Sequence, residues 1–325
     1  MNGPITRRDF LEGSALALGA AGPALASGAD EPPLYGGEIV DTHLHLWDLQ
    51  SLRLPWIAAA TGRAKEVLGG DHLLTDYARE AQGLRISRAV YMEVDVLEAD
   101  QLKEAEAISA LCAKGNSPLV AAVVSGRPAS AGFAAYLDRL KGNPFVKGVR
   151  QVLHTGATHP RYFLEDDFVR GVKLLGERDL SFDLCLRNDQ LEDGARLVEL
   201  CPGTRFILDH CGNPHAGSLD LEAWRKGLAR VAEAGGGRAM CKVSGLYANV
   251  RAEEWPAEKL APIVRAVLDL FGPDRVMFAS DWPVVDLGAS LRVWVEALKA
   301  IVRRDRAEHQ ARLFRENALR FYHLT

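Results

Sequence analysis

The sequence lacks three features that would each define a class of protein: a cysteine pair, a strong excess of one charge and a membrane-length hydrophobic run. Its five cysteines are scattered, and no Cys-x-x-Cys pair occurs among them, which argues against a disulfide framework. The net charge is only −4 over 325 residues, without the basic stripe that binds nucleic acid. No segment reaches the roughly 20 apolar residues that cross a bilayer. We therefore expect buried thiols and no nucleic-acid partner.

The first 29 residues have the pattern of an export signal rather than of a folded domain. Arg7 and Arg8 precede the apolar segment 13–26, which ends in the small-residue cleavage site Ala-Leu-Ala at 24–26. Paired arginines followed by Phe-Leu resemble the twin-arginine signal, which implies the twin-arginine export machinery as a partner. We expect residues 1–29 to be this signal, the mature protein to be periplasmic or secreted, and no stable membrane association after cleavage. The alternative is a membrane anchor that is never cleaved.

After residue 38 the chain alternates short apolar segments with amphipathic ones, and no internal repeat or low-complexity linker interrupts it. Short β-branched runs are typical of strands that are covered on both faces. We expect strands at 38–43, 86–94, 119–125, 146–152, 180–185, 205–209, 239–243 and 275–279. Apolar residues spaced by three and four predict helices at 100–114, 167–178, 219–233, 256–271, 291–302 and 307–319.

Eight strands that alternate with helices favour a parallel sheet, closed as a single-domain (β/α)8 TIM barrel over residues 30–325. The structural alternative is an open, doubly wound sheet, which would place a glycine-rich phosphate loop after its first strand. Here that position reads His-Leu-His. Segment 49–70 is irregular and contains proline, tryptophan and glycine, so we expect it to form a loop over the barrel mouth.

Three histidines follow strands whose carboxyl ends would meet at the barrel mouth, where barrels of this kind hold their active sites. His43 and His45 are two residues apart on an extended segment, so their side chains point the same way and can reach one metal ion. His210 ends the sixth predicted strand and precedes a Gly-Asn-Pro turn. Together they make a three-nitrogen set appropriate for zinc. A chance pair and a structural histidine are the alternatives.

Two charged residues stand at the ends of the second and fourth predicted strands. Glu93 lies in an apolar strand, where a carboxylate is rarely found without a partner. A metal ion or an arginine would supply one, and a solvent-exposed strand end is the alternative. Arg150 would point into the mouth, where a guanidinium fork suits a polar oxygen of the substrate. Its alternative role is an ion pair inside the barrel with Glu93.

The seventh and eighth strands deliver the remaining candidates. Lys242 and Ser244 share one face of a strand, and they would bind substrate oxygens or fill a polar layer of the barrel. Asp281 follows the apolar run Val-Met-Phe, where a carboxylate can take a proton from an attacking water and return it to the leaving group. Helix capping is its alternative role. Tyr247 would help to fix the substrate, and Trp282 would shape one wall.

Four motifs, in order and spacing, resemble the amidohydrolase-2 group of the amidohydrolase superfamily, and within it the branch of sugar lactonases and pyrone- or muconolactone-type hydrolases. They are Val-Asp-Thr-His-Leu-His at 40–45, Leu-Asp-His-Cys-Gly-Asn-Pro at 208–214, Lys-Val-Ser-Gly-Leu at 242–246 and Phe-Ala-Ser-Asp-Trp-Pro at 278–283. The resemblance extends over residues 38–320. It implies a distorted TIM barrel, hydrolysis of a cyclic ester and catalysis by Asp281. By direct match it marks the three histidines as site residues.

The resemblance also bears on the metal. Glu93 occupies a position where some relatives carry a metal-binding carboxylate, and Arg150 lies in a Lys-Gly-Val-Arg motif that relatives use near the substrate. The chain has no counterpart of a carboxylated-lysine bridge, which implies one metal ion rather than two. Some members of the branch work without a metal and bind the substrate with their histidines.

We therefore predict a metal-dependent lactonase with one divalent ion, zinc, that activates a water. The predicted metal ligands are His43, His45, Glu93, His210 and Asp281. The predicted catalytic residues are Asp281 and His210, and the predicted substrate-binding residues are Arg150, Lys242, Ser244, Tyr247 and Trp282. One alternative is a decarboxylase of an aromatic or unsaturated acid on the same barrel. The other is an exported binding protein that has lost catalysis.

Overall fold

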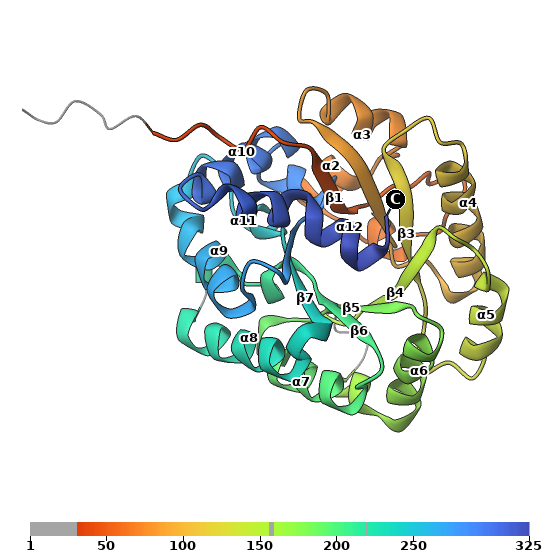
Figure 1. The fold of residues 1–325 in the computed structure, drawn as a ribbon. Helices are drawn as coiled ribbons and strands as arrows, with labels where there is room; N and C mark the ends of the chain where they lie inside the picture. The colour runs from red at the N-terminus through yellow and green to blue at the C-terminus, as the bar shows by residue number, and fades with distance from the viewer. Residues whose placement is uncertain (1–30, 156–158, 219, 325) are drawn as a thin grey trace, which may run out of the picture. The chain divides into compact units, whose positions relative to one another are not determined.

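Each strand of the structure pairs in parallel with the next one along the chain, in the order β1-β2-β3-β4-β5-β6-β7-β8 (Figure 1). The computed structural model describes residues 31–155, 159–218 and 220–324, so the predicted signal at 1–29 lies outside them. Residues 34–325 form one compact unit, which contains the sheet. The strands are β1 Ile39–Leu44, β2 Ile86–Met92, β3 Leu119–Ser125, β4 Val146–Val152, β5 Ser181–Cys185, β6 Arg205–Leu208, β7 Ala239–Val243 and β8 Val276–Phe278. The predicted (β/α)8 barrel is confirmed.

Helices follow the strands and surround the sheet (Figure 1). They are α3 Leu74–Glu80, α4 Gln101–Ala113, α5 Phe133–Leu140, α6 Asp166–Glu177, α7 Leu191–Leu200, α8 Leu221–Gly235, α9 Ala257–Phe271 and α10 Leu291–Val302. The first residue of the helix predicted at 219–233 lies outside the described residues. The helix predicted at 307–319 is instead α11 Ala307–Ala311, a π-helical turn Arg312–Glu316 and α12 Asn317–Tyr322. Segment 49–70 is less irregular than expected, because it contains α1 Pro55–Ala58 and α2 Gly62–Leu68.

Local chemistry explains where several helices begin and end. Asp220 caps α8, because its side chain accepts a hydrogen bond from the Ala223 amide at 3.0 Å. Ser290 caps α10 in the same way through the Val293 amide at 3.3 Å. Gly272 ends α9 with φ +72°, a conformation that costs a glycine little. The two N-terminal caps fix the helix ends that receive loops from the carboxyl ends of β6 and β8, and Gly272 lies at the other end of the barrel, before β8.

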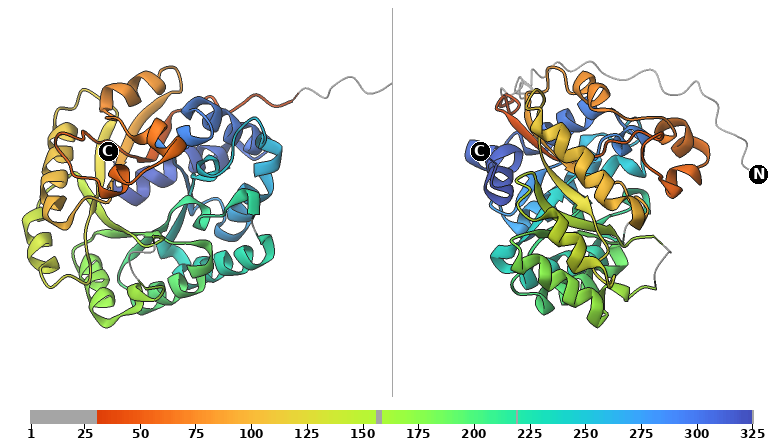
Figure 2. Two further views of the ribbon diagram at one scale, coloured as in Figure 1. Left: turned by 180° about the vertical axis from the view of Figure 1, so that it is seen from behind. Right: turned by 90° about the vertical axis from the view of Figure 1, so that its right-hand side faces the viewer.

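The end of the barrel where the strands begin is closed by the C-terminal helix. Phe321 and Tyr322 of α12 pack against apolar side chains from inside β2, β3, β6, β7 and β8. In the side view of Figure 2, the C-terminal helices and α1 with α2 lie at opposite ends of the barrel. The strands end under α1 and α2, so this second end is the mouth that is available for a site.

Side chains, rather than strand pairing alone, close the barrel between β1 and β8. The two backbones meet where Asp281 N donates to His43 O at 2.8 Å. The buried Asp41 carboxylate accepts from the Ser280 amide at 2.8 Å and from the Tyr77 hydroxyl at 2.8 Å. Thr42 Oγ1 donates to the Phe278 carbonyl at 2.7 Å. These bonds hold β1 and the segment after β8 in a fixed register, and both carry predicted site residues.

The remaining sequence expectations concern cysteines and membranes. All five cysteines are free and buried, as expected. Within the part of the chain that the structure describes, no helix combines the length and the apolar character needed to cross a membrane.

Candidate active site

Two histidines and a carboxylate, far apart in the sequence, meet at the carboxyl ends of β1 and β8. His43 Nε2 lies 3.1 Å from His45 Nε2. Asp281 Oδ1 lies 3.7 Å from the first of these nitrogens and 3.5 Å from the second. All three side chains are buried. The geometry brings together three ligand atoms that the sequence predicted as neighbours.

The protonation of His43 and of His45, which follows β1, leaves lone pairs for this cluster. His45 Nδ1 lies 3.0 Å from the carbonyl oxygens of Met92 and Glu93. Because carbonyl oxygens only accept, Nδ1 carries the proton and Nε2 is the free acceptor. Burial holds the pKa of His43 well below its usual value, although Asp209 opposes this shift. His43 is therefore a neutral imidazole near pH 7, as a metal ligand must be.

The third histidine comes from a strained turn after β6. His210 and the next residue have φ of +52° and +55°, a region that non-glycine residues seldom adopt and that concentrates at functional sites. Its Nδ1 lies 2.9 Å from Ser244 Oγ and 3.8 Å from Asp281 Oδ2. Its ring centre lies 4.5 Å from that of His43. Burial lowers the pKa of His210, against the opposing charge of Asp281.

A layer of buried charges lies directly beneath the histidines. Lys242 Nζ is 2.5 Å from Asp183 Oδ2, 3.1 Å from Asp209 Oδ1 and 3.5 Å from His43 Nδ1. Lys242 is thus bound to two carboxylates and does not reach the mouth cavity described below. Neither aspartate was predicted as a site residue from the sequence. Each is a lone carboxylate in an apolar strand, the same signal that drew attention to Glu93.

Glu93 and Arg150 form an ion pair inside the barrel, which was one of the two roles expected for each. Arg150 Nε donates to Glu93 Oε1 at 2.6 Å, and the second carboxylate oxygen accepts from the Asp95 amide at 2.6 Å. Both oxygens of Glu93 are therefore engaged, and the structure does not bring this residue into the ligand cluster. Arg150 also lies 3.4 Å from Asp209 Oδ2 and lines the mouth cavity.

The structure places two further predicted residues behind the site rather than in it. The Tyr247 hydroxyl donates to the Trp255 carbonyl at 2.9 Å. The ring of Trp282 packs edge-on against His72 and Tyr77. Neither residue lines the cavity at the mouth. Their predicted substrate contacts are therefore absent from this geometry, because both side chains turn into the core.

A cavity of about 450 Å³ opens over the cluster. His45, His210, Asp281 and Arg150 line its floor. The apolar part of its lining is Trp56, Leu68, Val94, Val152, Cys185, Gly245, Ala248, Val284 and Leu287, and the polar part beyond the floor is Asp95, His154, Thr155, Arg187, Asn213, His215 and Asn249. A cavity of this size, with a few convergent polar groups, is typical of a small-molecule site.

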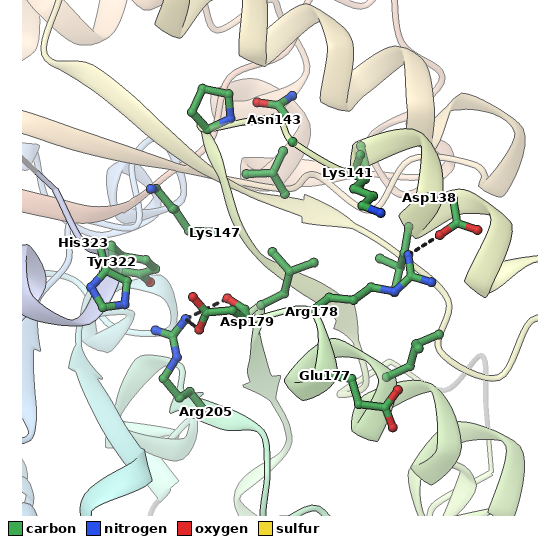
Figure 3. A pocket seen from close by; sticks show the side chains of 17 residues that line it. Asp138, Lys141, Asn143, Lys147, Glu177, Arg178, Asp179, Arg205, Tyr322 and His323 are labelled. Atoms are coloured by element: carbon green, nitrogen blue, oxygen red, sulfur yellow. Dashed lines mark hydrogen bonds and ion pairs between the residues drawn. The ribbon is translucent and has the colours of Figure 1, made fainter.

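A second pocket, of about 630 Å³, lies at the opposite end of the barrel, where β4, β5 and β6 begin (Figure 3). Both of its arginines are paired with carboxylates: Arg178 with Asp138 at 2.7 Å and Arg205 with Asp179 at 3.1 Å. None of the clustered histidines lines it. The mouth cavity, not this pocket, holds the reactive groups.

The cluster in the mouth cavity fits a metal ion by its donor set and spacing. His43, His45 and Asp281 can each offer one ligand atom to a common ion, and His43, Asp209 and His210 form a second such group. A tetrahedral zinc with bonds of about 2.0–2.1 Å requires ligand atoms about 3.3 Å apart. The separations of 3.1, 3.5 and 3.7 Å in the first group match this value. Three protein ligands also leave one position open, as in catalytic sites.

The site has no room for a side chain at position 245, which is a glycine. It has φ +70°, and a Cβ there would lie 2.7 Å from His210 Cβ and 2.9 Å from its Nδ1. We expect Gly245→Ala to displace the imidazole and to lower kcat/KM at least about ten-fold, the loss that follows misplacement of a catalytic group. Steady-state kinetics and thermal unfolding would measure both effects.

The control is Gly115→Ala, where φ is +63° and no atom lies within 4 Å of the added Cβ. Both substitutions place alanine at a positive φ, at a cost of about 1 kcal/mol. Only the first places a methyl group against His210. Equal activities of the two variants would contradict the role given to the His210 position.

The comparisons with known proteins agree with the site. A family model described as Amidohydrolase matches residues 40–324. An L-fucono-1,5-lactonase of Burkholderia multivorans is 32% identical over 267 residues, which cover 77% of this chain and 84% of that protein. An amidohydrolase structure from Burkholderia multivorans with bound zinc is 25% identical, with a TM-score of 0.77 over 89% of this chain and 100% of that chain. A 5-carboxyvanillate decarboxylase structure from Novosphingobium aromaticivorans, complexed with manganese, is 16% identical, with a TM-score of 0.60 over 92% of this chain and 98% of that chain. At this identity the likeness shows a shared fold alone.

Proposed function

The chain belongs to the amidohydrolase family, and we propose that it is a lactonase that opens a cyclic ester with one divalent metal ion, zinc. The observation that carries the proposal is the buried cluster of His43, His45 and Asp281 at the floor of a cavity. Its support from the comparisons is the lactonase relative of more than 30% identity. His43, His45 and Asp281 would hold the ion. When bound, a divalent ion lowers the pKa of a water and polarises a carbonyl oxygen.

Asp281 moves the proton in the proposed reaction. The water oxygen attacks the lactone carbonyl carbon, and Asp281 accepts the proton that the water loses. The ring C–O bond then breaks, and Asp281 returns that proton to the departing alkoxide oxygen. One lactone and one water give one hydroxy acid. The Asp281 carboxylate lies on the cavity lining, 3.5 to 3.8 Å from the histidine nitrogens, close enough to serve both steps.

His210 and Arg150 supply the polar contacts for the substrate. Ser244 orients the His210 ring through Nδ1, and His210 lines the cavity. Arg150 is held in place by Glu93, so its guanidinium presents a fixed positive charge to the cavity floor. Donors that are fixed before the reaction stabilise the negative charge of the carbonyl oxygen at no reorganisation cost.

The test combines metal analysis with a hydrolysis assay. We expect about one equivalent of zinc in unchelated protein, and acid release from at least one member of a panel of sugar and muconate lactones, followed by a pH indicator. Chelation should remove at least about nine-tenths of this activity, and added zinc should restore it. A panel of aromatic acids monitored for carbon dioxide would reveal a decarboxylase instead. Hydrolysis that is intact without metal would retain the lactonase and assign the histidines to substrate binding.

A further inference from the structure

An exposed arginine joins two segments that meet over the cavity. Arg63, in α2, donates from Nε to the Leu287 carbonyl at 2.5 Å and from Nη2 to the Asp286 carbonyl at 3.1 Å. These carbonyls end the 3₁₀ turn Val284–Leu287, which follows β8. The last carbonyls of a helical turn have no partner inside it and attract a cation. One guanidinium therefore caps this turn from a segment more than 200 residues away in the sequence.

The joined segments supply four of the apolar side chains that line the cavity. Trp56 and Leu68 come from the 49–70 segment, and Val284 and Leu287 come from the capped turn. The Trp56 indole nitrogen donates to the Val94 carbonyl at 2.8 Å, which fixes the ring beside Val94, a further apolar residue of the lining. We refer to these five residues as the apolar wall. Arg63 is the described side chain that hydrogen-bonds α2 to the capped turn across it.

The rest of the lining comes from other strands and loops and is mostly polar, with Val152, Cys185 and Ala248 as its apolar side chains. His154, Thr155, Arg187, Asn213, His215 and Asn249 follow β4, β5, β6 and β7. A ligand that fills this cavity contacts hydrogen-bonding groups from these loops and an apolar surface from the wall. The cavity is thus suited to a small ring with polar groups on one part and an alkyl group on another.

We propose that Arg63 is a positioning residue that holds the apolar wall, and that this wall selects lactones whose ring carries an alkyl substituent. The choice of substrate rests on the proposed lactonase function, whereas the cap rests on the two hydrogen bonds of Arg63. A methyl group that leaves water for an apolar surface gains roughly four-fold in binding. That gain requires a wall that is ordered before the substrate binds. If the wall became ordered only on binding, its loss of conformational entropy would offset the gain.

The selectivity test compares two lactones that differ by one ring methyl group, δ-valerolactone and δ-hexalactone. Wild-type protein should favour δ-hexalactone by about four-fold in kcat/KM. Arg63→Ala should reduce this preference to about one, through a KM that rises about four-fold for δ-hexalactone while kcat stays nearly unchanged. Arg63→Lys, which keeps the charge but not the fork, should retain part of the preference. The control is Arg170→Ala on α6, which removes an exposed arginine paired with Asp167 and should change neither value.

A second measurement separates failure of the cap from failure of the lactonase function. In the absence of any substrate, hydrogen exchange at residues 284–288 should be faster in Arg63→Ala than in wild type and in Arg170→Ala. If wild type hydrolyses no lactone, the proposed function is wrong, and hydrogen exchange still decides whether Arg63 holds the turn. An unchanged exchange rate, or an unchanged preference between the two lactones in an active enzyme, would overturn the inference.

Discussion

Replacing Asp281 with asparagine is expected to lower kcat for lactone hydrolysis by about three orders of magnitude while the protein stays folded. General acid–base catalysis by a positioned side chain contributes about 10²–10⁴-fold, and Asp281 serves both proton transfers in the proposed reaction. Its carboxylate also offers one of the three ligand atoms of the candidate metal cluster. The amide retains one oxygen but cannot accept the proton. Steady-state kinetics on the most reactive lactone would measure the loss.

The backbone makes asparagine the informative substitution. Asp281 has φ +62°, and asparagine is among the few residues that adopt this region readily. Alanine would add backbone strain and confuse a chemical defect with a folding defect. Asp167→Asn, on the exposed face of α6, is the control with the same chemical change. An Asp281→Asn enzyme with near-normal kcat would remove Asp281 from the reaction, provided that its circular dichroism matches that of wild type.

Much of the architecture could be predicted because it depends on local patterns. Each strand is a short apolar run that is covered on both faces, and every predicted strand lies within two residues of its observed bounds. The carboxyl ends of parallel strands meet in space, so His43, His210 and Asp281 could be placed together from strand order alone. The break between α11 and α12 was not predicted, because the apolar spacing continues through the π-helical turn at Arg312–Glu316.

The direction of individual side chains could not be predicted, because it depends on neighbours from other strands. The sequence left Glu93 as either a metal ligand or an ion-pair partner, and only the approach of Arg150 to 2.6 Å favours the second role. Tyr247 was expected at the mouth, but its ring turns toward Trp294 in the core. The apolar wall was equally hidden, since its members come from segments at opposite ends of the chain.

The buried charge layer holds the histidines of the site in place through one shared carboxylate, that of Asp209. Asp209 faces Lys242, His43 and Arg150 at 3.1, 3.5 and 3.4 Å. It is adjacent to His210 in the sequence, so one carboxylate links the β1 histidine to the β6 turn. Burial favours the protonated form of Asp209, but the charge of Lys242 and the hydrogen bond with His43 hold its pKa well below the usual value. Asp209 therefore stays ionised and keeps His43 oriented.

Replacing Lys242 with methionine is expected to destabilise the protein by about 3–5 kcal/mol, the usual result of leaving a buried charge without its partner. Lys242 is fully buried, and two carboxylates depend on its charge. Urea unfolding at pH 7.5 would measure the loss. Lys147→Met, on β4, is the matched control, because Lys147 is only partly buried and no hydrogen bond or ion pair to its ammonium group is found within the described residues.

The pH dependence of the Lys242→Met deficit identifies its cause. Burial raises the pKa of Asp183 to about 7 even in the presence of Lys242, which lowers it. A carboxyl whose folded pKa lies above its unfolded value of about 3.9 favours folding at low pH, and this contribution is lost as the pH rises through the folded value. Removal of Lys242 raises that folded pKa further, so the deficit should be smaller at pH 5 than at pH 8. Lys242→Met/Asp183→Asn should recover part of the stability at pH 8, because it removes one unpaired charge. A deficit that is equal at both pH values and unchanged in the double variant would assign the loss to packing rather than to charge.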